Sequence, residues 1–447
     1  MNRFRVICCT IATLCLLRGP AFAAIIGTST TANAPGILIN GTTVSLYIPY
    51  ASDDSLRFRS ALKVIETASG VLSKTVVLKT GFVNSCAADP STGIAVCSGD
   101  FGSSYAIGAA RNVTGFKTGV VKRIHFTGGD CANCGVAIDD SLSGVPTAII
   151  ATGQGYLSVS LSPVSRGGLI GTNDDVVSGQ FGYDPVNHRI LSPNYTIKNL
   201  RTFESGNPDY QIIDMATGTA FDFKDKGIFF NSNGMCTTNS GGTTQRDALP
   251  DSAAYDINTG IAYGTFRSPA DCTGANTVTD LAMFDLGQAS FDTASKMWSD
   301  TGAQIQTLTE MTNLSNGLTG IAIPPGKSLA IVADRHERFG GSTGFGALSL
   351  PTSSGGTPAL VDWVQATMPN DPLRRPWRMS NMPNGLTAYV SPNDGKGYGV
   401  ILNRTRTYAA KVDIAGLLAL PRSSAHTISS STDLSGVVQF VDIRPNR

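Results

Sequence analysis

The chain repeats one local pattern six times: a short apolar run ends in a turn, and a second small or apolar run follows it. The paired runs lie at 83–90 and 93–97, 134–140 and 148–151, 181–185 and 190–191, 253–256 and 260–263, 318–323 and 329–332, and 386–390 and 398–401. Each pair is typical of a β-hairpin, and the pairs recur roughly every 45 to 70 residues. This period predicts a β-propeller in which each blade places one hairpin at its inner edge.

The composition also predicts an all-β chain. Its 49 glycines and 22 prolines, with many Thr, Ser and Asn residues, favour short strands and tight turns over helices. Only Leu56 to Val71 has any helical periodicity. We therefore predict a single β-propeller domain over residues 74–447, with six blades, or seven if a degenerate blade lies in a long gap. Residues 24–73 are expected to form an N-terminal extension that packs on the ring.

Two apolar segments near the ends of the chain are candidates for closing the ring. They are Thr75 to Leu78 and Val437 to Val441. An open ring would leave an unpaired sheet edge, so we expect these segments to share the last blade.

The N-terminus has the pattern of a cleavable signal peptide over residues 1–23. A short basic stretch, Met1 to Arg5, precedes the apolar stretch Val6 to Leu17, and Ala21-Phe22-Ala23 supplies small residues at the cleavage site. No later stretch is long and apolar enough to span a membrane. The mature protein is therefore expected to be secreted or periplasmic. Loss of three arginines leaves 31 basic against 33 acidic residues, without a basic run, which argues against nucleic acid as a partner.

Six cysteines remain after the signal peptide: Cys86, Cys97, Cys131, Cys134, Cys236 and Cys272. An even number in an oxidising compartment indicates disulfides. A bridge between the two strands of the first hairpin would join Cys86 and Cys97, and a second would join Cys236 to Cys272 across the fourth. Cys131 and Cys134 form a CxxC motif, which is found in redox couples, zinc sites and local disulfides. The local disulfide is favoured, because no second CxxC and no thioredoxin-like βαβ unit is present.

Polar residues recur just before the first strand of each predicted hairpin: Asn84, Asn133, Gln180, Asp251, Asn316 and Asn384. A second polar set, which includes Arg267, Asp334 and Arg404, follows the second strands. Because the two open ends of a hairpin lie together, both sets are expected at one mouth of the ring, a common place for a ligand. Asn84, Gln180, Arg267 and Arg404 are the predicted ligand-binding residues. A ring of amide and carboxylate oxygens also suits Ca²⁺, although Asn and Asp are equally common as strand caps and turn residues.

The hairpins resemble those of the six-bladed lactonase and gluconolactonase type of propeller, and more loosely those of NHL and YVTN repeat propellers. In the lactonase type, a Ca²⁺ ion at the channel mouth is held by Asn, Asp and Glu side chains and polarises the ester carbonyl. By placement, the resemblance implies Asn133, Asp251, Asn316 and Asn384 as metal ligands. The glutamate ligand that is usual near the first inner strand is missing from this sequence.

His336 lies between two acids in Asp334-Arg335-His336-Glu337-Arg338, directly after a predicted second strand. A histidine there, with Asp334, can act as a general base that activates water. The same residues also fit a solvated, salt-bridged loop.

Two classes of function are consistent with these features. The first is a module that binds a small molecule, a polymer or a protein through its mouth and its long loops. The second is a Ca²⁺-dependent hydrolase of lactones or esters, in which His336 or Asp334 activates water. The sequence alone does not decide whether the chain is an enzyme.

Overall fold

The structure is a computed structural model, and it describes most of the chain from residue 36 to residue 442. The described residues are 36–40, 42–51, 58–66, 75–79, 85–89, 91–92, 94–98, 104–109, 119–125, 135–139, 142, 144–152, 155–171, 181–199, 204–222, 231–237, 243–247, 249–267, 272–273, 279–287, 290–292, 297–299, 304–309, 320–334, 344–352, 362–367, 383–403, 408–420, 426–427 and 436–442. The described elements are β-strands, apart from the short helix α1 (Ile414–Leu418). The predicted all-β class is therefore confirmed. The predicted signal peptide lies outside the described residues.

Seven described sheets contain four or more strands, each pairing its strands in chain order, and we number them sheets 1 to 7. Sheet 1 has β1 (Gly36–Asn40), β2 (Thr43–Ala51), β3 (Phe58–Glu66) and β4 (Thr75–Lys79). Sheet 2 has β5 (Ser85–Asp89), β6 (Ile94–Ser98), β7 (Ser104–Ala109) and β8 (Gly119–His125). Sheet 3 has β9 (Val136–Asp139), β10 (Thr147–Thr152), β11 (Gly155–Leu161) and β12 (Val164–Gly171). Sheet 4 has β13 (Gly182–Asp184), β14 (Arg189–Asn199), β15 (Glu204–Asp214) and β16 (Thr219–Asp222).

The remaining three sheets follow the same antiparallel plan. Sheet 5 has β19 (Leu249–Asp256), β20 (Ile261–Arg267), β22 (Thr279–Asp285) and β25 (Gln304–Thr309). Sheet 6 has β26 (Gly320–Ala322), β27 (Leu329–Asp334), β28 (Gly344–Ser349) and β29 (Asp362–Thr367), and β33 (His426–Thr427) pairs with β29 in parallel. Sheet 7 has β30 (Pro383–Val390), β31 (Gly397–Asn403), β32 (Tyr408–Asp413) and β34 (Val438–Asp442). Two small sheets lie outside this series: β17 (Asn231–Thr237) with β18 (Thr243–Asp247) and β21 (Cys272–Thr273), and β23 (Ser290–Asp292) with β24 (Met297–Ser299).

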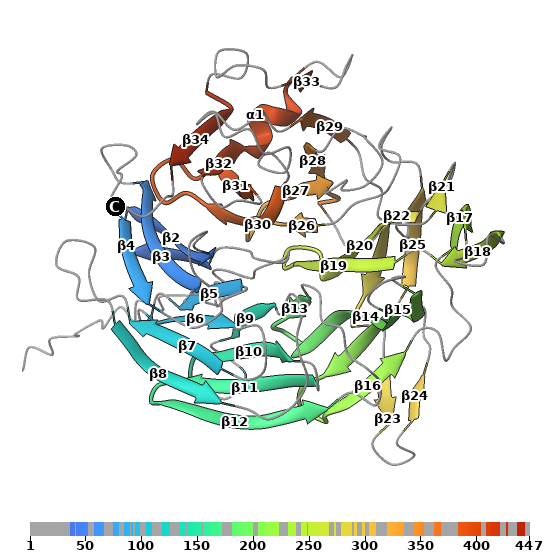
Figure 1. The fold of residues 1–447 in the computed structure, drawn as a ribbon, viewed down its shortest axis with the longest axis horizontal. Helices are drawn as coiled ribbons and strands as arrows, with labels where there is room; N and C mark the ends of the chain where they lie inside the picture. Colours follow the sequence, from blue (N-terminus) through green and yellow to red (C-terminus); the bar gives the residue numbers. More distant parts are fainter. Residues whose placement is uncertain are drawn as a thin grey trace, which may run out of the picture.

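The seven sheets follow one another around a common centre, with the first strand of each sheet toward that centre (Figure 1). These first strands pack closely: β1 contacts β5, β13 contacts β19, and β30 contacts β1. Glycine makes the close approach possible at two equivalent places. A Cβ atom on Gly36 would lie 2.9 Å from the carbonyl carbon of Cys86, and one on Gly182 would lie 3.1 Å from that of Ala254.

The core consists of apolar layers between neighbouring sheets. One layer joins Val96 of sheet 2 to Ile150 and Leu157 of sheet 3, and the other described layers join further neighbouring pairs in the same way. Most strands in the middle of the sheets are therefore covered on both faces, and every residue of β10 is buried. This explains why the sequence has short continuous apolar runs instead of a polar and apolar alternation.

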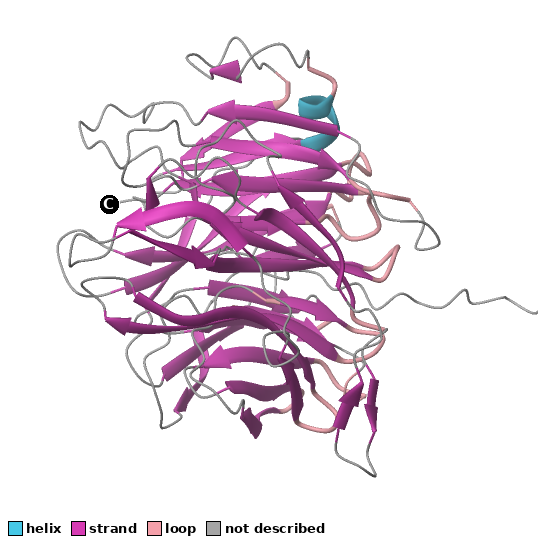
Figure 2. Ribbon diagram, turned by 90° about the vertical axis from the view of Figure 1, so that its right-hand side faces the viewer, coloured by secondary structure: helices cyan, strands magenta, loops and turns pink. Residues whose placement is uncertain are grey.

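The described loops gather on one side of the molecule (Figure 2). They include the turns between the first and second strands and between the third and fourth, and we call this side the turn face. Aspartates that end strands organise these turns by accepting hydrogen bonds from backbone N–H groups two or three residues ahead. The pairs are Asp89 with Ser91 (3.1 Å), Asp184 with Val186 (2.8 Å), Asp214 with Thr217 (2.9 Å) and Asp256 with Asn258 (2.9 Å). These four carboxylates are buried, so each turn satisfies an acid that would otherwise be costly to bury.

Two expectations about the chain ends are wrong. Residues 36–66 contribute three strands of sheet 1 instead of packing outside the repeat, and residues 58–66, within the one stretch with weak helical periodicity, form strand β3. The boundary at residues 73 and 74 therefore cuts through one sheet. The two proposed closing segments also lie in different sheets, because β4 pairs with β3 whereas β34 pairs with β32.

A search of the described residues for a helix that is long and apolar enough to cross a membrane found none.

Candidate functional site

The residues predicted for the mouth fall into two groups. Asn84, Asn133, Gln180, Asn316, His336 and Arg404 lie outside the described residues. Asp251, Arg267, Asp334 and Asn384 lie within described strands, although only their backbone positions are described. The roles assigned to all ten residues remain predictions.

The four described positions share one side of their sheets, opposite the turn face. Arg267 and Asp334 are the last residues of β20 and β27, which both begin at turn-face hairpins. Asp251 lies where the register of β19 and β20 shifts, between Pro250 and Ser252. Asn384 lies at an equivalent register shift, between Pro383 and Gly385. An extra residue at such a bulge redirects side chains locally, and bulges are frequent beside binding sites.

Two predicted cysteine pairs stand directly opposite each other in described ladders. Cys86 of β5 is the register partner of Cys97 in β6, and Cys236 of β17 is the partner of Cys272 in β21. Opposed residues in an antiparallel pair have Cα atoms about 4.5–5.5 Å apart, a separation that a disulfide can bridge. The strand register is compatible with both bridges, and the two disulfides remain predictions. Cys131 and Cys134 lie outside the described residues.

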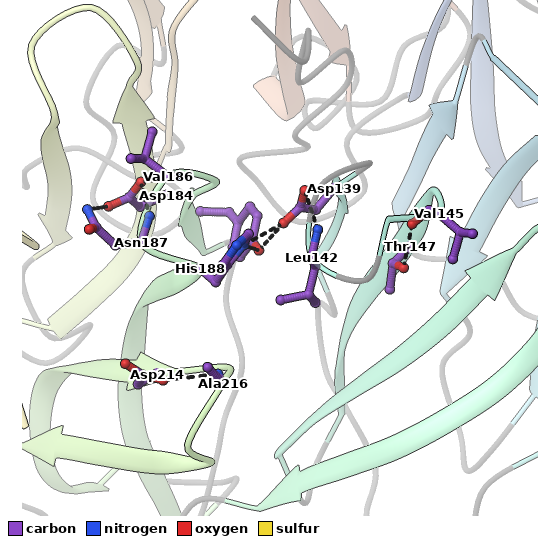
Figure 3. Close-up of polar contacts among 11 residues, drawn as sticks. Asp139, Leu142, Val145, Thr147, Asp184, Val186, Asn187, His188, Asp214 and Ala216 are labelled. Atoms are coloured by element: carbon purple, nitrogen blue, oxygen red, sulfur yellow. Dashed lines mark hydrogen bonds and ion pairs between the residues drawn. The ribbon is translucent and has the colours of Figure 1, made fainter. Parts of the chain in front are cut away.

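The most distinctive described polar cluster is on the turn face, where sheets 3 and 4 meet. It contains Asp139 at the end of β9, Tyr183 in β13, and His188 in the turn between β13 and β14 (Figure 3). The Nδ1 atom of His188 lies 3.0 Å from Oδ2 of Asp139 and 3.3 Å from the hydroxyl of Tyr183. The hydroxyl of Tyr183 donates to the same Asp139 oxygen. One carboxylate oxygen thus joins two residues of the neighbouring sheet.

The residues of this cluster differ in how deeply they are buried. The side chain of Asp139 is fully buried, whereas 27% of the His188 side chain is exposed. Burial, with the hydrogen bond and negative charge of Asp139, raises the pKa of Tyr183 far above its ordinary value, so the phenol stays protonated and donates. A carboxylate only accepts hydrogen bonds, so Nδ1 of His188 carries a proton. The Nε2 atom of His188 is then the ring atom that can serve a partner outside the cluster.

The turn that carries His188 is held firmly. Asp184 accepts hydrogen bonds from the backbone of Val186 and from the Asn187 side chain, the latter at 2.6 Å. His188 itself has a φ of 53°, a left-handed conformation that few residues other than glycine adopt. Its carbonyl accepts from the backbone N–H of Met215, 3.0 Å away. The histidine is therefore fixed in place by contacts on both sides.

An exposed apolar side chain lies in the same turn as His188. Val186, two residues earlier in the same turn, is 71% exposed, and it is one of the few large apolar side chains of the described core sheets that faces outward. A buried Asp–His pair with an outward Nε2 can polarise a hydroxyl or accept a hydrogen bond. The described contacts of the cluster include no hydroxyl nucleophile on the Nε2 side. Within the described ranges there is also no group of three His, Cys, Asp or Glu side chains able to hold a metal ion.

Sequence reasoning missed this cluster, because Asp139 and His188 are 49 residues apart. The sequence analysis also gave no role to the repeated acids at the ends of inner strands. Asp89, Asp139, Asp184 and Asp256 occupy that position in four consecutive sheets. This repetition is the signal that would have directed attention to the turn face.

Comparison with solved structures shows the fold. The chain is similar to the WD40 domain of coronin from Toxoplasma gondii, at 9% identity, covering 93% of this chain and 96% of that chain with a TM-score of 0.50. A functionally unknown protein from Desulfotomaculum acetoxidans is aligned over 92% of this chain and 99% of that chain, at 15% identity and a TM-score of 0.46. The coronin likeness supports a β-propeller, as the sequence predicted. No family model matches the chain, and no curated protein matches it.

Proposed function

We propose that this chain is a seven-bladed β-propeller that binds a protein partner, with sheets 1 to 7 as its blades. The observation that carries the proposal is the turn Val186–His188, in which an exposed apolar side chain lies two residues from a partly exposed imidazole that Asp139 holds in place. Rigid anchors of this kind lose little conformational entropy when a partner docks. The propeller fold agrees with the proposal, because it offers a stable frame from which turns and loops can make contacts.

The partner contact is proposed to centre on His188 and Val186. Because Nδ1 of His188 faces Asp139, the Nε2 atom is the ring nitrogen left for a polar group of the partner. An apolar partner side chain would cover Val186.

Site-specific photo-crosslinking tests this proposal. A photoreactive residue at position 186 in the full chain, expressed in the organism that produces it, should give one discrete cross-linked protein. The same residue at position 169 is the matched control, because Leu169 is also an exposed large apolar residue but lies on the outermost strand β12. When the photoreactive residue at position 186 is combined with His188→Asn, the cross-linked product should disappear. Equal products from both positions, or none from 186, would overturn the proposed surface.

A Ca²⁺-dependent hydrolase is the alternative proposal. It rests on the predicted ligands Asn133, Asp251, Asn316 and Asn384, and the bulges at Asp251 and Asn384 favour it because they mark the same place in two sheets. The measurement is the calcium content of the protein purified without chelators. About one Ca²⁺ per chain that is lost in Asp251→Ala would support a metal-binding mouth and justify a lactone and ester panel. Absence of stoichiometric calcium would remove this alternative.

The site of action remains a proposal from the N-terminal sequence. We propose that the mature protein is exported, in agreement with residues 1–23. The N-terminal residue of the natural protein tests this: a start at Ala24 supports export, and a start at Met1 contradicts it.

A further inference from the structure

The ring has one junction where the two ends of the propeller chain meet. Sheets 1 and 7 contact each other through β1 and β30, yet no described ladder joins them. The described strands of the two sheets pair only within their own sheet. We call this junction the seam. Its strength depends on side-chain contacts, because it has no described backbone ladder across it.

A single buried acid gathers the polar contacts at the seam. Glu66, the last residue of β3 in sheet 1, is 4% exposed. Its Oε2 atom accepts hydrogen bonds from Tyr389 at 2.7 Å and from the Lys411 ammonium at 2.9 Å. Its Oε1 atom accepts from the Ser391 hydroxyl and from Asn393 at 2.9 Å. All four donors belong to sheet 7 or its first turn, and with Glu66 they form what we call the Glu66 cluster.

The negative charge of Glu66 is balanced by one ammonium group of sheet 7. Lys411 is 11% exposed and pairs directly with Glu66, and its ammonium also lies 4.0 Å from the centre of the Tyr398 ring. Tyr398 stacks on Tyr389 with ring centres 5.7 Å apart, and its hydroxyl donates to Asp394 at 2.7 Å. The charged and titratable groups that face Glu66 from sheet 7 are therefore Lys411, Tyr389, Tyr398 and Asp394. The one cation is Lys411, so loss of the Glu66 charge leaves that cation without its closest acid.

A second contact across the seam comes from the same turn. The Asn393 amide also donates to the carbonyl of Thr42, between β1 and β2, at 2.8 Å. Beneath these polar contacts lies an apolar layer in which Ile37 and Leu46 of sheet 1 meet Val400 of sheet 7. The apolar layer resembles those between other sheets, and a buried acid also joins sheets 3 and 4 at Asp139. Glu66 differs from Asp139 in that it gathers four donors of the neighbouring sheet, one of them the Lys411 ammonium.

We propose that the Glu66 cluster closes the propeller, and that the ring opens at the seam when the Glu66 carboxylate is neutralised or removed. The proposal concerns a conformational change of the ring and does not depend on the proposed partner. Opening would separate sheet 1 from sheet 7 while the sheets on the far side of the ring stay folded.

Hydrogen exchange measured by mass spectrometry on the full chain tests the proposal. Glu66→Gln keeps the shape of the side chain and removes its charge. We expect exchange in β1, β2, β30 and β31 to become about tenfold faster or more, because hydrogen bonds to a buried charge are lost. Exchange in β10 and β11 of sheet 3 should not change. Uniform acceleration over all sheets, or no acceleration at the seam, would overturn the proposal.

The matched control is an ion pair of the same sheet that does not cross the seam. Lys396 Nζ lies 2.6 Å from Asp413 Oδ2, and both residues belong to sheet 7 or its first turn. Lys396→Met should leave exchange at the seam unchanged, and an acceleration equal to that of Glu66→Gln would contradict a special role for Glu66. If Glu66→Gln does not fold, Asn393→Ala is the second variant, because it removes only the contacts from Asn393 to Glu66 and Thr42. It should accelerate exchange at the seam alone, and unchanged exchange there would refute the proposal.

Discussion

The imidazole of His188 lies 3.0 Å from the carboxylate of Asp139, although the two residues belong to different sheets. The contact therefore joins sheets 3 and 4 on the turn face through a fully buried acid. It also fixes the ring orientation of the one residue other than glycine that has a positive φ within the described ranges. Asp139 therefore stabilises the contact between sheets 3 and 4 and also sets the orientation of the His188 ring on the turn face.

Asp139→Ala should lower the free energy of unfolding by about 1–3 kcal/mol, since it leaves the buried Tyr183 hydroxyl without its acceptor. Urea unfolding monitored by fluorescence measures this change. Asp139→Ala combined with Tyr183→Phe should cost less than Asp139→Ala alone, because the stranded hydroxyl is then gone. A double variant that is less stable than the single variant would show that the hydroxyl is not stranded.

Acid should weaken the seam once the Glu66 carboxylate is protonated. Burial raises the pKa of Glu66, but the hydrogen bonds from Ser391, Asn393, Lys411 and Tyr389 outweigh burial, so its pKa lies below the ordinary value of 4.5. The folded protein thus binds this proton less readily than the unfolded chain does. The stabilisation from Glu66 is complete above about pH 4.5 and is lost as the pH falls through the lowered pKa.

Thermal unfolding of wild type and Glu66→Gln between pH 7 and pH 3 measures that loss. The difference in Tm between the two proteins should be largest at pH 7 and should shrink in acid. A difference that stays constant over this range would show that Glu66 is not the titrating group.

Peptide mapping without reduction should recover Cys86 linked to Cys97 and Cys236 linked to Cys272, since each pair is opposed in a described ladder. Replacement of Cys236 and Cys272 by serine should cost about 2–4 kcal/mol, as expected for loss of a disulfide that closes a loop. Free thiols at these four positions in protein from an oxidising compartment would contradict this prediction.

Gly264→Ala should destabilise the junction of sheets 4 and 5. A Cβ atom at this position would lie 2.6 Å from Cζ of Tyr210, whose hydroxyl donates to the carbonyls of Ser252 and Thr265. Overpacking of this kind costs about 1–3 kcal/mol. Gly168→Ala is the matched control, because a Cβ there has no neighbour within 4 Å, and denaturant unfolding should show it close to wild type. Equal stability of the two variants would refute this steric account.

The recurring hairpins could be predicted from sequence because each one is a local unit: an apolar run, a turn and a second apolar run. The hairpin of β1 and β2 carried a signal that we did not use. Asn40 pairs with Thr43, which leaves the two-residue connection 41–42, and a glycine at the first position of a two-residue loop between apolar runs is a hairpin signal. The helical reading of Leu56 to Val71 failed because β3 is covered by β2 and β4, and pairing overrode a weak local periodicity.

The contacts that join different sheets could not be predicted in this way. Glu66 meets Tyr389 across 323 residues of sequence, and Tyr183 meets Asp139 across 44. Such partners depend on which side of each strand faces the neighbouring sheet. A shift of one residue along a strand reverses that side. Ser391 accepts a hydrogen bond from the backbone N–H two residues later, as Asp184 does in sheet 4, so the two residues occupy equivalent positions. Tyr389, two residues before Ser391, faces sheet 1 and contacts Glu66.

Because the four antiparallel strands of each blade come in chain order, the polypeptide can be divided between sheets 4 and 5 without splitting either one. A circularly permuted gene that begins at β19 and ends after β16 would keep every antiparallel ladder of the seven sheets. In that rearranged protein a covalent linker joins the natural ends, so the junction of sheets 1 and 7 no longer depends only on the Glu66 cluster, the Asn393–Thr42 contact and the apolar layer.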